Sequence, residues 1–449
     1  MKFGYKSETG ATILGLFALA SCIVFPKGYI PTIISLWVIV GRLVARGAIN
    51  HVRPVNDADP AEKRAKARFV MSRGMPLEKR PVAIVTGTNS GIGYWTAVGL
   101  AAEGYEVIVT CRSEALSAKT AEKIRAEAES ERRSNPQTYA NSPERVLVQA
   151  KLPVECDNFD SVRAFVDWVS VAYATRNVQV LVNNAGVMRA DITFSSFHPN
   201  LELHTAVNFL GPLLLTELLL PLLEKNGGRV VYVSSEAHRF PQSVLGAGLL
   251  DLWKWANSYP TCMGLAGGKL LTALQQLNQG SEKSSGLLHT TKFGKSLCRY
   301  GASKLLNTYH AHVIARRYAL DDTKPGTLGV DACSLHPGCV STNISRSMLG
   351  SFLGAIFAWG SLLFLKTSWE GAQTTLHCAM CPREELKLVA PCSKKPITSP
   401  DAVSPYFVEC TERTRSMLLA YGWDVKEAEA VVEWGKLQVG LQKSALKVD

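Results

Sequence analysis

The second half of the chain holds a tyrosine and a lysine whose spacing suits proton transfer. Lys304 follows Tyr300 by four residues, so on a helix the two side chains lie on the same face. A tyrosine side chain has a pKa of about 10 and is a poor base at neutral pH. We expect the ammonium of Lys304 to favour the tyrosinate and lower the pKa of Tyr300, so that the phenol can exchange a proton with a substrate oxygen.

A glycine-rich turn near residue 90 predicts a site for a nucleotide. The β-branched run at 82–85 is typical of a buried parallel strand, a helix pattern then extends to about residue 103, and a second strand pattern covers 106–110. In such a βαβ unit the helix N-terminus offers free N–H groups to a pyrophosphate and glycines let the backbone approach it, although a glycine-rich turn alone is equally compatible with an ordinary loop. The turn consists of Thr86, Gly87, Thr88, Asn89, Ser90, Gly91, Ile92 and Gly93.

Five further motifs, in order along the chain, make the region 81–441 resemble the short-chain dehydrogenase/reductase family. The turn has the family's Gly-x-x-x-Gly-x-Gly spacing after a threonine, and residues 300–307 and 366–375 are most similar to the retinol-dehydrogenase-like branch. The five motifs are LVNNAG at 181–186, VNFLG at 207–211, GRVVYVSS at 228–235, YGASK at 300–304 and HPGCVST at 336–342. The resemblance implies an α/β fold: a single Rossmann-type catalytic domain over 81–449, with a doubly wound parallel sheet.

The resemblance assigns catalytic roles to four residues, which are Asn208, Ser235, Tyr300 and Lys304. Ser235, at the end of a strand pattern, would hydrogen-bond the substrate oxygen together with Tyr300, and family position favours it over Ser234. Asn208 would hold a water that relays protons through Lys304. Taken singly, the tyrosine and lysine are compatible with an amphipathic surface pair and the serine with a strand-end cap, so it is the joint pattern that indicates a site.

The cofactor choice depends on the residue that follows the second strand pattern. An acidic residue there would favour NAD, whereas Arg112 can bind the 2′-phosphate of NADP. We therefore expect NADP(H), with NAD as the weaker alternative and a solvated loop arginine as the ordinary interpretation of Arg112. Glu155 and Asp157 are two candidates for the family's acidic contact to adenine. The cofactor-binding residues that the resemblance implies are Thr86, Gly87, Asn89, Ser90, Gly91, Ile92, Gly93, Arg112, Asn184, Ala185, Gly186, Tyr300, Lys304, Pro337, Gly338 and Thr342.

Residues 1–45 are predicted to form a membrane anchor. Two apolar stretches, 11–25 and 29–41, would measure about 22 Å and about 20 Å as helices, against a hydrocarbon core of about 30 Å. One kinked helix across both stretches, or a hairpin in one leaflet, fits this pattern. A signal peptide cleaved near residue 20 is the competing interpretation.

The linker at 46–80 concentrates positive charge beside this anchor. Residues 42–80 contain ten Lys/Arg and four Asp/Glu, and their net +6 is more than half of the chain's net +11. The positive-inside rule then puts the catalytic domain in the cytosol, with membrane lipids as partners of the basic cluster. The expected location is the endoplasmic reticulum membrane, or a lipid droplet if the anchor is a hairpin. Because the rest of the chain is only mildly basic, nucleic acid is not an expected partner.

Two apolar segments bear on the substrate and on assembly. The insertion at about 242–295 contains Trp253 and Trp255 among leucines, which suit a membrane interface, a cap on the sheet edge or a homodimer contact equally well. Residues 348–365 are nearly uncharged and, by family position, cover the substrate. That composition predicts a lipophilic small-molecule substrate, with a helix packed on the core or a second membrane contact as alternatives.

The composition fits a folded domain with reduced thiols. Of 449 residues, 47% are apolar and 19% charged, which excludes a disordered or low-complexity chain. Eleven cysteines, an odd and scattered set, indicate thiols rather than a disulfide scaffold. The one close pair is Cys378 and Cys381, and since a zinc site needs two more ligands at matching spacing, we expect no metal.

Together these patterns predict a membrane-anchored, NADP(H)-dependent oxidoreductase that interconverts a carbonyl and an alcohol on a retinoid, steroid or lipid-ketone type of substrate. Reduction is the expected direction in a cytosol that keeps NADPH reduced. Two alternatives stay open: an NAD-dependent alcohol dehydrogenase, and a catalytically silent membrane scaffold of the same fold. The four filled catalytic positions favour an enzyme.

Overall fold

The computed structural model describes most of the region expected to form the catalytic domain. The described residues are 72–239, 275, 292–319, 328–340, 366–390, 402–417 and 425–441. Outside them lie the expected anchor at 1–45, nearly all of the insertion at 242–295, Thr342 and the apolar segment 348–365.

The described strands form one eight-stranded sheet in the order β3-β2-β1-β4-β5-β6-β7-β8. Neighbouring strands pair in parallel, except that β7 and β8 form an antiparallel hairpin at the edge. The predicted doubly wound, mostly parallel sheet is therefore confirmed. The strands are β1 (Pro81–Thr86), β2 (Glu106–Thr110), β3 (Leu147–Gln149), β4 (Asn177–Asn183), β5 (Arg229–Val233), β6 (Asp331–His336), β7 (Tyr406–Val408) and β8 (Thr411–Glu412).

The central strands are buried on both faces, as their apolar sequences predict. In β1, Val82 and Ile84 join one core cluster, while Ala83 and Val85 join the other, because alternate side chains of a strand point to opposite faces. Every residue of β1 and of β2 is buried. Strands of this kind need helices on both sides of the sheet.

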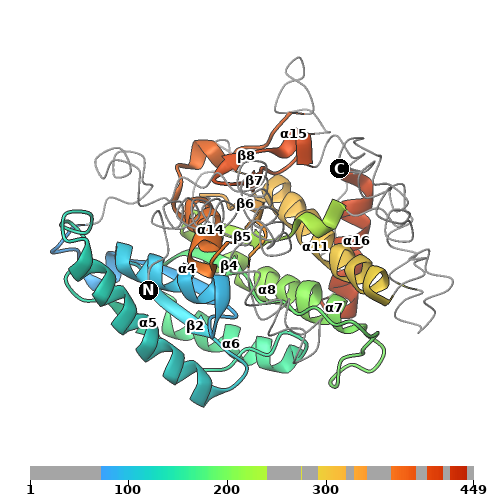
Figure 1. Cartoon of the computed structure of the whole chain (residues 1–449), viewed down its shortest axis with the longest axis horizontal. Coiled ribbons are helices and arrows are strands. Elements are labelled where there is room, and N and C mark those ends of the chain that lie inside the picture. Colours follow the sequence, from blue (N-terminus) through green and yellow to red (C-terminus); the bar gives the residue numbers. More distant parts are fainter. Residues whose placement is uncertain are drawn as a thin grey trace, which may run out of the picture.

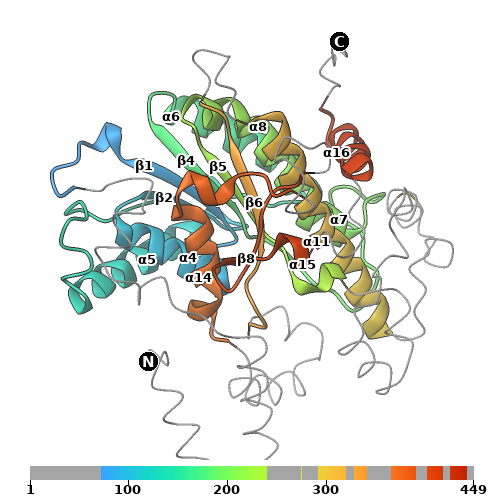
Figure 2. The ribbon, with the colours of Figure 1, turned by 90° about the horizontal axis from the view of Figure 1, so that it is seen from above.

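Helices cover both faces of the sheet (Figures 1 and 2). One face carries α4 (Gly91–Glu103), α5 (Glu114–Ser134) and α14 (Ser368–Met380), and the other carries α6 (Phe159–Ala172), α8 (Gly211–Lys225) and α11 (Lys292–Arg317). In Figure 2 the first group lies below the strands, and α6 and α8 lie above them. As the sequence predicts, α4 follows β1 through the glycine turn: it begins at Gly91, within the turn, and ends before Gly104, whose φ of 112° is left-handed.

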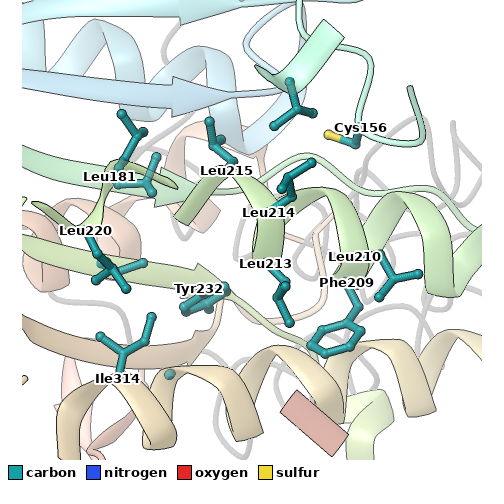
Figure 3. Packing of buried hydrophobic residues seen from close by; sticks show 14 of the residues in the cluster. Cys156, Leu181, Phe209, Leu210, Leu213, Leu214, Leu215, Leu220, Tyr232 and Ile314 are labelled. Atoms are coloured by element: carbon teal, nitrogen blue, oxygen red, sulfur yellow. The ribbon is translucent and has the colours of Figure 1, made fainter. Parts of the chain in front are cut away.

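The larger core cluster lies between α8, the sheet and α11. Figure 3 shows leucines of α8 beside Leu181 of β4 and Tyr232 of β5, with Ile314 reaching in from α11. Leu213 and Leu214 of α8 have no exposed surface. This packing fixes α8 and α11 against the strands whose ends form the site described below.

One helical run among the described residues is long and apolar enough to cross a membrane, by length and composition alone. It covers Leu203–Lys225 and combines α7 (Leu203–Thr205), the π-helical turn η3 (Ala206–Leu210) and α8; 72% of its most apolar window is buried inside the protein. Because it packs against α6 and the sheet, it is a core helix of this face. It does not bear on the expected N-terminal anchor.

The last described helix, α16 (Val425–Gln438), packs on α8 and α11 (Figure 1). Lys436 pairs with Glu217 of α8 at 2.8 Å. At Gly435 the helix comes so close that an added Cβ would lie 2.8 Å from a methyl carbon of Leu213 and 3.0 Å from the ring of Phe209. The remaining short helices are η2 (Leu77–Lys79), η4 (Glu236–Arg239), η5 (Arg383–Leu386) and α15 (Thr414–Met417).

Candidate active site

The carboxyl ends of β1 and β4 meet where the strand order reverses, which is where ligand sites form in open α/β sheets. The hydroxyl oxygen of Thr86, at the end of β1, accepts hydrogen bonds from the backbone N–H groups of Asn184 and Ala185, both at 3.0 Å. The side-chain amide of Asn184 donates to the carbonyl of Thr86 at 2.8 Å. These bonds join the two strand ends and shape the turn that follows β1.

The glycine turn between β1 and α4 is built from backbone. Gly87 and Gly91 have φ of 69° and 66°, in the region that favours glycine. At Gly93 an added Cβ would lie 2.3 Å from Asn184 Nδ2 and 2.5 Å from the carbonyl oxygen of Gly87. The turn therefore brings backbone N–H groups to a helix start, which suits a phosphate. The other predicted turn residues are exposed or half-buried and are Asn89, Ser90 and Ile92.

Arg112 lies at the same edge of the sheet as the glycine turn. Thr86 and Thr110 are register partners at the ends of β1 and β2, and Arg112 follows two residues later, exposed, just before α5 begins. The hydroxyl of Thr88 donates to the carbonyl of Thr110 at 3.2 Å and ties the turn to this strand end. An exposed guanidinium at this position can meet a phosphate on the adenosine side of a nucleotide.

Of the two acidic candidates for an adenine contact, Asp157 is turned inward. Its Oδ2 accepts the hydroxyl of Ser195 at 2.8 Å, and the residue is buried. Glu155 is half-buried. The geometry leaves Glu155 as the more accessible of the two carboxylates.

Tyr300 and Lys304 lie near each other on α11, as their spacing predicts, but their pKa values depart from expectation. Nζ of Lys304 is 5.7 Å from the centroid of the Tyr300 ring and donates to the carbonyl of Val233 at 2.9 Å. Burial raises the pKa of Tyr300 to about 12, against a hydrogen bond with Ser235 that lowers it. Burial also lowers the pKa of Lys304 to about 8. The expected acidification of the phenol by the ammonium is wrong for the chain alone, because desolvation of both side chains dominates.

The Tyr–Lys pair and the glycine turn are joined through the end of β4. An added Cβ on Gly186 would lie 3.2 Å from Nζ of Lys304 and 3.3 Å from Oδ1 of Asn208. An added Cβ on Gly87 would lie 2.9 Å from Cα of Ala185. Residues 185 and 186 therefore contact both parts of the predicted site, which lie at one edge of the sheet.

The two serines that follow β5 have different partners. Ser234 is buried, donates its hydroxyl to the carbonyl of Lys304 at 2.8 Å and accepts the hydroxyl of Thr308 at 3.3 Å, so it ties β5 to α11. Ser235 is half-buried and shares a side-chain hydrogen bond with Tyr300. Of the two, Ser235 is the one beside the phenol, which supports its choice as the catalytic serine.

Asn208 lies in the π-helical turn η3. Its amide accepts the N–H of Val187 at 2.7 Å, donates to the carbonyl of Val187 at 2.9 Å and donates to the hydroxyl of Ser303 at 2.9 Å. Ser303 in turn donates to the carbonyl of Tyr300 at 2.7 Å, a link that the sequence did not single out. Both amide hydrogens of Asn208 are thus committed. Oδ1 accepts one N–H, and an amide oxygen has a second lone pair that can accept another hydrogen bond.

The loop after β6 holds Pro337 and Gly338, two of its predicted cofactor residues. Gly338 has a φ of 89°, and an added Cβ there would lie 2.7 Å from Nζ of Lys366. Lys366 is buried and forms an ion pair with Glu409, in the β7–β8 turn. The sequence pattern did not single out Lys366, although a charge that ends a long apolar segment is a signal for such a paired residue.

Three side chains near the end of α14 could offer ligands to a metal ion. The ligand atoms of His377, Cys381 and Glu385 lie within 4.8 Å of one another. The guanidinium of Arg229 donates to Sγ of Cys381 at 3.6 Å, and burial raises the pKa of that thiol to about 12. A cation would have to displace the thiol proton beside a positive charge, so we keep the expectation of no metal. The cysteines whose side chains are described are free thiols.

Comparison with known proteins assigns this site to a family. Residues 81–247 match the family described as short chain dehydrogenase. The chain is also 31% identical over 348 residues to retinol dehydrogenase 12 of Bos taurus, an alignment that covers 76% of this chain and 87% of that protein. The chain belongs to the short-chain dehydrogenase family. It is an oxidoreductase of that family, as the motifs predicted.

Two further proteins are similar to this chain. Retinol dehydrogenase 14 of Homo sapiens is 27% identical over 362 residues, which are 80% of this chain and 86% of that protein. A solved gluconate 5-dehydrogenase from Burkholderia cenocepacia, in complex with NADP and tartrate, aligns at 17% identity and a TM-score of 0.42 over 68% of this chain and 89% of that chain. The predicted similarity to retinol dehydrogenases is confirmed by the relatives of about 30% identity. The family to which the chain belongs uses NAD or NADP.

Proposed function

We propose that this short-chain dehydrogenase is a membrane-anchored, NADP(H)-dependent enzyme that interconverts a carbonyl and an alcohol on a lipophilic substrate, with reduction as its working direction. One observation carries the proposal: Lys304 and Asn208 approach Gly186, at the end of the strand that also contacts the glycine turn. A proton-transfer group and a nucleotide turn at one sheet edge are what hydride transfer to a carbonyl requires.

The residues around the turn fit a dinucleotide. At Gly87 and Gly93 an added Cβ would collide with residues 184 and 185 or with the carbonyl of Gly87, so the tight turn that places the start of α4 requires glycine. The N-terminus of α4 would hold the pyrophosphate, Arg112 would bind the 2′-phosphate of NADP, and Pro337 and Gly338 would lie along the nicotinamide end. When bound, the cofactor supplies the hydride. NADP is preferred over NAD because the strand end carries Arg112 and no carboxylate.

Tyr300 is the proposed proton donor to the substrate oxygen. Because burial raises its pKa to about 12, the phenol is protonated at neutral pH, which is the state that reduction needs. Ser235 would hydrogen-bond the same oxygen. Lys304, with a pKa of about 8, can give up and regain a proton near neutral pH, and a water on Asn208 would return that proton.

The proposed substrate class follows from the apolar segment and the relatives. Two relatives are named retinol dehydrogenases, and segment 348–365 is nearly uncharged; both support a retinoid or a similar lipophilic carbonyl. An anchor at 1–45 and a basic linker at 46–80 would hold the catalytic domain, 81–449, at the cytosolic surface of the endoplasmic reticulum membrane, in which such substrates dissolve.

The test is NADPH oxidation by the purified full chain in detergent, with retinal, a keto-steroid and a long-chain ketoacyl compound as substrates. Tyr300→Phe is the matched control because it removes a single hydroxyl. We expect turnover of at least one substrate by the wild-type chain. In Tyr300→Phe the rate should fall by about a hundredfold to ten-thousandfold, the usual contribution of general acid catalysis, while NADPH binding is retained.

Each other outcome has a definite meaning. Turnover with NADH but not NADPH would show that the cofactor is NAD and not NADP. NADPH binding without turnover of any of the three substrate classes would favour a silent scaffold over the enzyme. Unchanged turnover in Tyr300→Phe would remove Tyr300 from the mechanism.

A further inference from the structure

Loop 187–190, which continues from the end of β4, is held by side chains from two helices. The backbone N–H of Arg189 donates to Nε2 of His204 at 2.9 Å, and the carbonyl of Arg189 accepts the hydroxyl of Ser296 at 2.6 Å. The carbonyl of Ala190 accepts the guanidinium of Arg299 at 2.9 Å. His204 lies in α7 and the other two in α11. The loop therefore bridges the two helical segments that bring in the proton-transfer residues.

The same contacts enclose a buried carboxylate. Glu202 and His204 have no exposed surface, and Arg299 is 2% exposed. Oε1 of Glu202 lies 2.5 Å from Nδ1 of His204 and 3.8 Å from Nε of Arg299, and Oε2 accepts the N–H of Thr205 at 3.0 Å. Burial raises the pKa of Glu202, whereas hydrogen bonds from Nδ1 of His204 and from the N–H of Thr205 lower it. A buried charge is costly to strip of its partners, which favours one arrangement of the group.

His204 and Arg299, the two side chains beside Glu202, both lie next to Tyr300. Arg299 directly precedes it in α11, and the ring of His204 stands edge-on to the Tyr300 ring, with 6.5 Å between centroids. We propose that Glu202, His204 and Arg299 are positioning residues, which hold Tyr300 and loop 187–190 in the arrangement needed for proton transfer. This inference rests on the proposed function, because the placement of the phenol matters only if Tyr300 is the proton donor.

The hydrogen bonds define the form of the His204 imidazole. Because Nε2 accepts the N–H of Arg189, that nitrogen carries no proton, and the proton is on Nδ1, facing Glu202. The amide of a glutamine can replace the Nε2 acceptor, whereas the amide of an asparagine can replace the Nδ1 donor. His204→Gln therefore keeps the bond to Arg189, and His204→Asn keeps the bond to Glu202. This pair of variants separates the two contacts.

The test combines kinetics with deuterium exchange at the amide of Arg189. We expect His204→Asn to lower kcat about tenfold through misplacement of the phenol, to leave KM for NADPH within about twofold because the glycine turn is untouched, and to speed exchange at Arg189. His204→Gln, which keeps the bond to Arg189 but not the one to Glu202, should slow exchange again and recover part of kcat. Ser296→Ala, which removes one hydroxyl from the other side of the loop, should change kcat and exchange in the same sense by a smaller factor.

Equal losses of kcat in the two His204 variants would overturn the positioning role, as would faster exchange at Arg189 without any change in kcat. If His204→Asn does not fold, Ser296→Ala is the deciding variant. Faster exchange at Arg189 in Ser296→Ala without any change in kcat would then overturn the positioning role. The failure of this inference differs from that of the proposed function. A wild-type chain with turnover but fast exchange at Arg189 refutes the inference alone, whereas slow exchange without turnover refutes the proposed function.

Discussion

The two ends of the candidate site are built in opposite ways. At the proton-transfer end, Asn208, Lys304 and Tyr300 are 0%, 3% and 9% exposed, and side-chain hydrogen bonds tie them to neighbouring elements. At the nucleotide end, the glycine turn presents backbone, and Arg112, the residue proposed to choose the cofactor, is exposed. One end is specified by side-chain contacts and the other by the absence of side-chain bulk.

This difference determines what each end tolerates. Replacing a buried, hydrogen-bonded side chain leaves a partner unsatisfied, which costs about 1–3 kcal/mol. A turn built from backbone instead limits the size of the side chains that fit in it. An exposed residue beside the turn can be replaced without disturbing the fold. The chemistry should therefore depend on many side chains, and cofactor preference on very few.

The largest effect after loss of the phenol is expected at Lys304. Lys304→Met removes the ammonium but keeps the length of the side chain, and it should lower the rate of hydride transfer about a thousandfold because the proton can no longer be relayed. Single-turnover rates at saturating NADPH would measure this without a contribution from binding. A loss smaller than about tenfold would contradict a role in proton transfer.

The same substitution should change how stability depends on pH. The folded protein lowers the pKa of Lys304 from 10.5 to about 8, so between these values the unfolded chain binds more protons than the folded one. The free energy of unfolding of the wild type should therefore rise with pH across that window, and Lys304→Met should lack this slope. Denaturant unfolding at pH 8 and pH 10 would show it, and parallel slopes for the two proteins would contradict the shift.

The two serines after β5 give the next test of the side-chain end. Ser235→Ala should lower kcat about a hundredfold, because it removes a donor to the substrate oxygen. Ser234→Ala should instead lower the free energy of unfolding by about 1 kcal/mol, because it removes the bond to the carbonyl of Lys304. Steady-state kinetics and urea unfolding of both variants would decide, and the reverse pattern would assign catalysis to Ser234.

At the nucleotide end, added bulk should weaken both cofactors together. In Gly93→Ala the new Cβ would meet the carbonyl oxygen of Gly87 at 2.5 Å, and an overpacking cost of about 1–3 kcal/mol corresponds to about a tenfold to hundredfold loss of affinity. Fluorescence titration with NADPH and NADH would measure it. Gly74→Ala, where a Cβ meets nothing within 4 Å, is the matched control.

The smallest and most selective effect is expected at Arg112. Arg112→Ala should weaken NADPH binding about tenfold, because one charge-assisted contact to the 2′-phosphate is lost, and should leave NADH binding unchanged. Arg112→Lys, which keeps the charge, should recover part of the loss. Equal weakening of both cofactors would show that Arg112 supports the fold of the turn and does not read the phosphate.

The frame of the fold could be predicted because local signals set it. The β-branched run before the glycine turn became β1, and Gly104 ends α4. Family motifs likewise named Tyr300, Lys304 and Asn208 before any contact between them was known. Such motifs identify site residues because the functional residues of each motif lie on a single strand end or helix face, so they are close together in the sequence.

What could not be predicted depends on burial and on partners far apart in the chain. A spacing of four residues puts Lys304 near Tyr300 but does not reveal that both are desolvated, which reverses the expected direction of the phenol's pKa. Asp157 is turned toward Ser195, and no local pattern indicates that pairing. Glu202 and His204 did leave a signal, since polar residues within an apolar helical stretch need buried partners.

The contact of α16 with Phe209 and Leu213 gives the end of the chain an importance that its distance from the motifs would not suggest. Phe209 lies in the turn that carries Asn208, and Leu213 lies in the first turn of α8 behind it. A stop codon or frameshift that removes only the residues after 424 would spare every catalytic position, yet it would uncover apolar surface directly behind that turn. Such a late truncation should act as a severe allele, detected as aggregated or degraded protein rather than as a stable enzyme with a shortened tail.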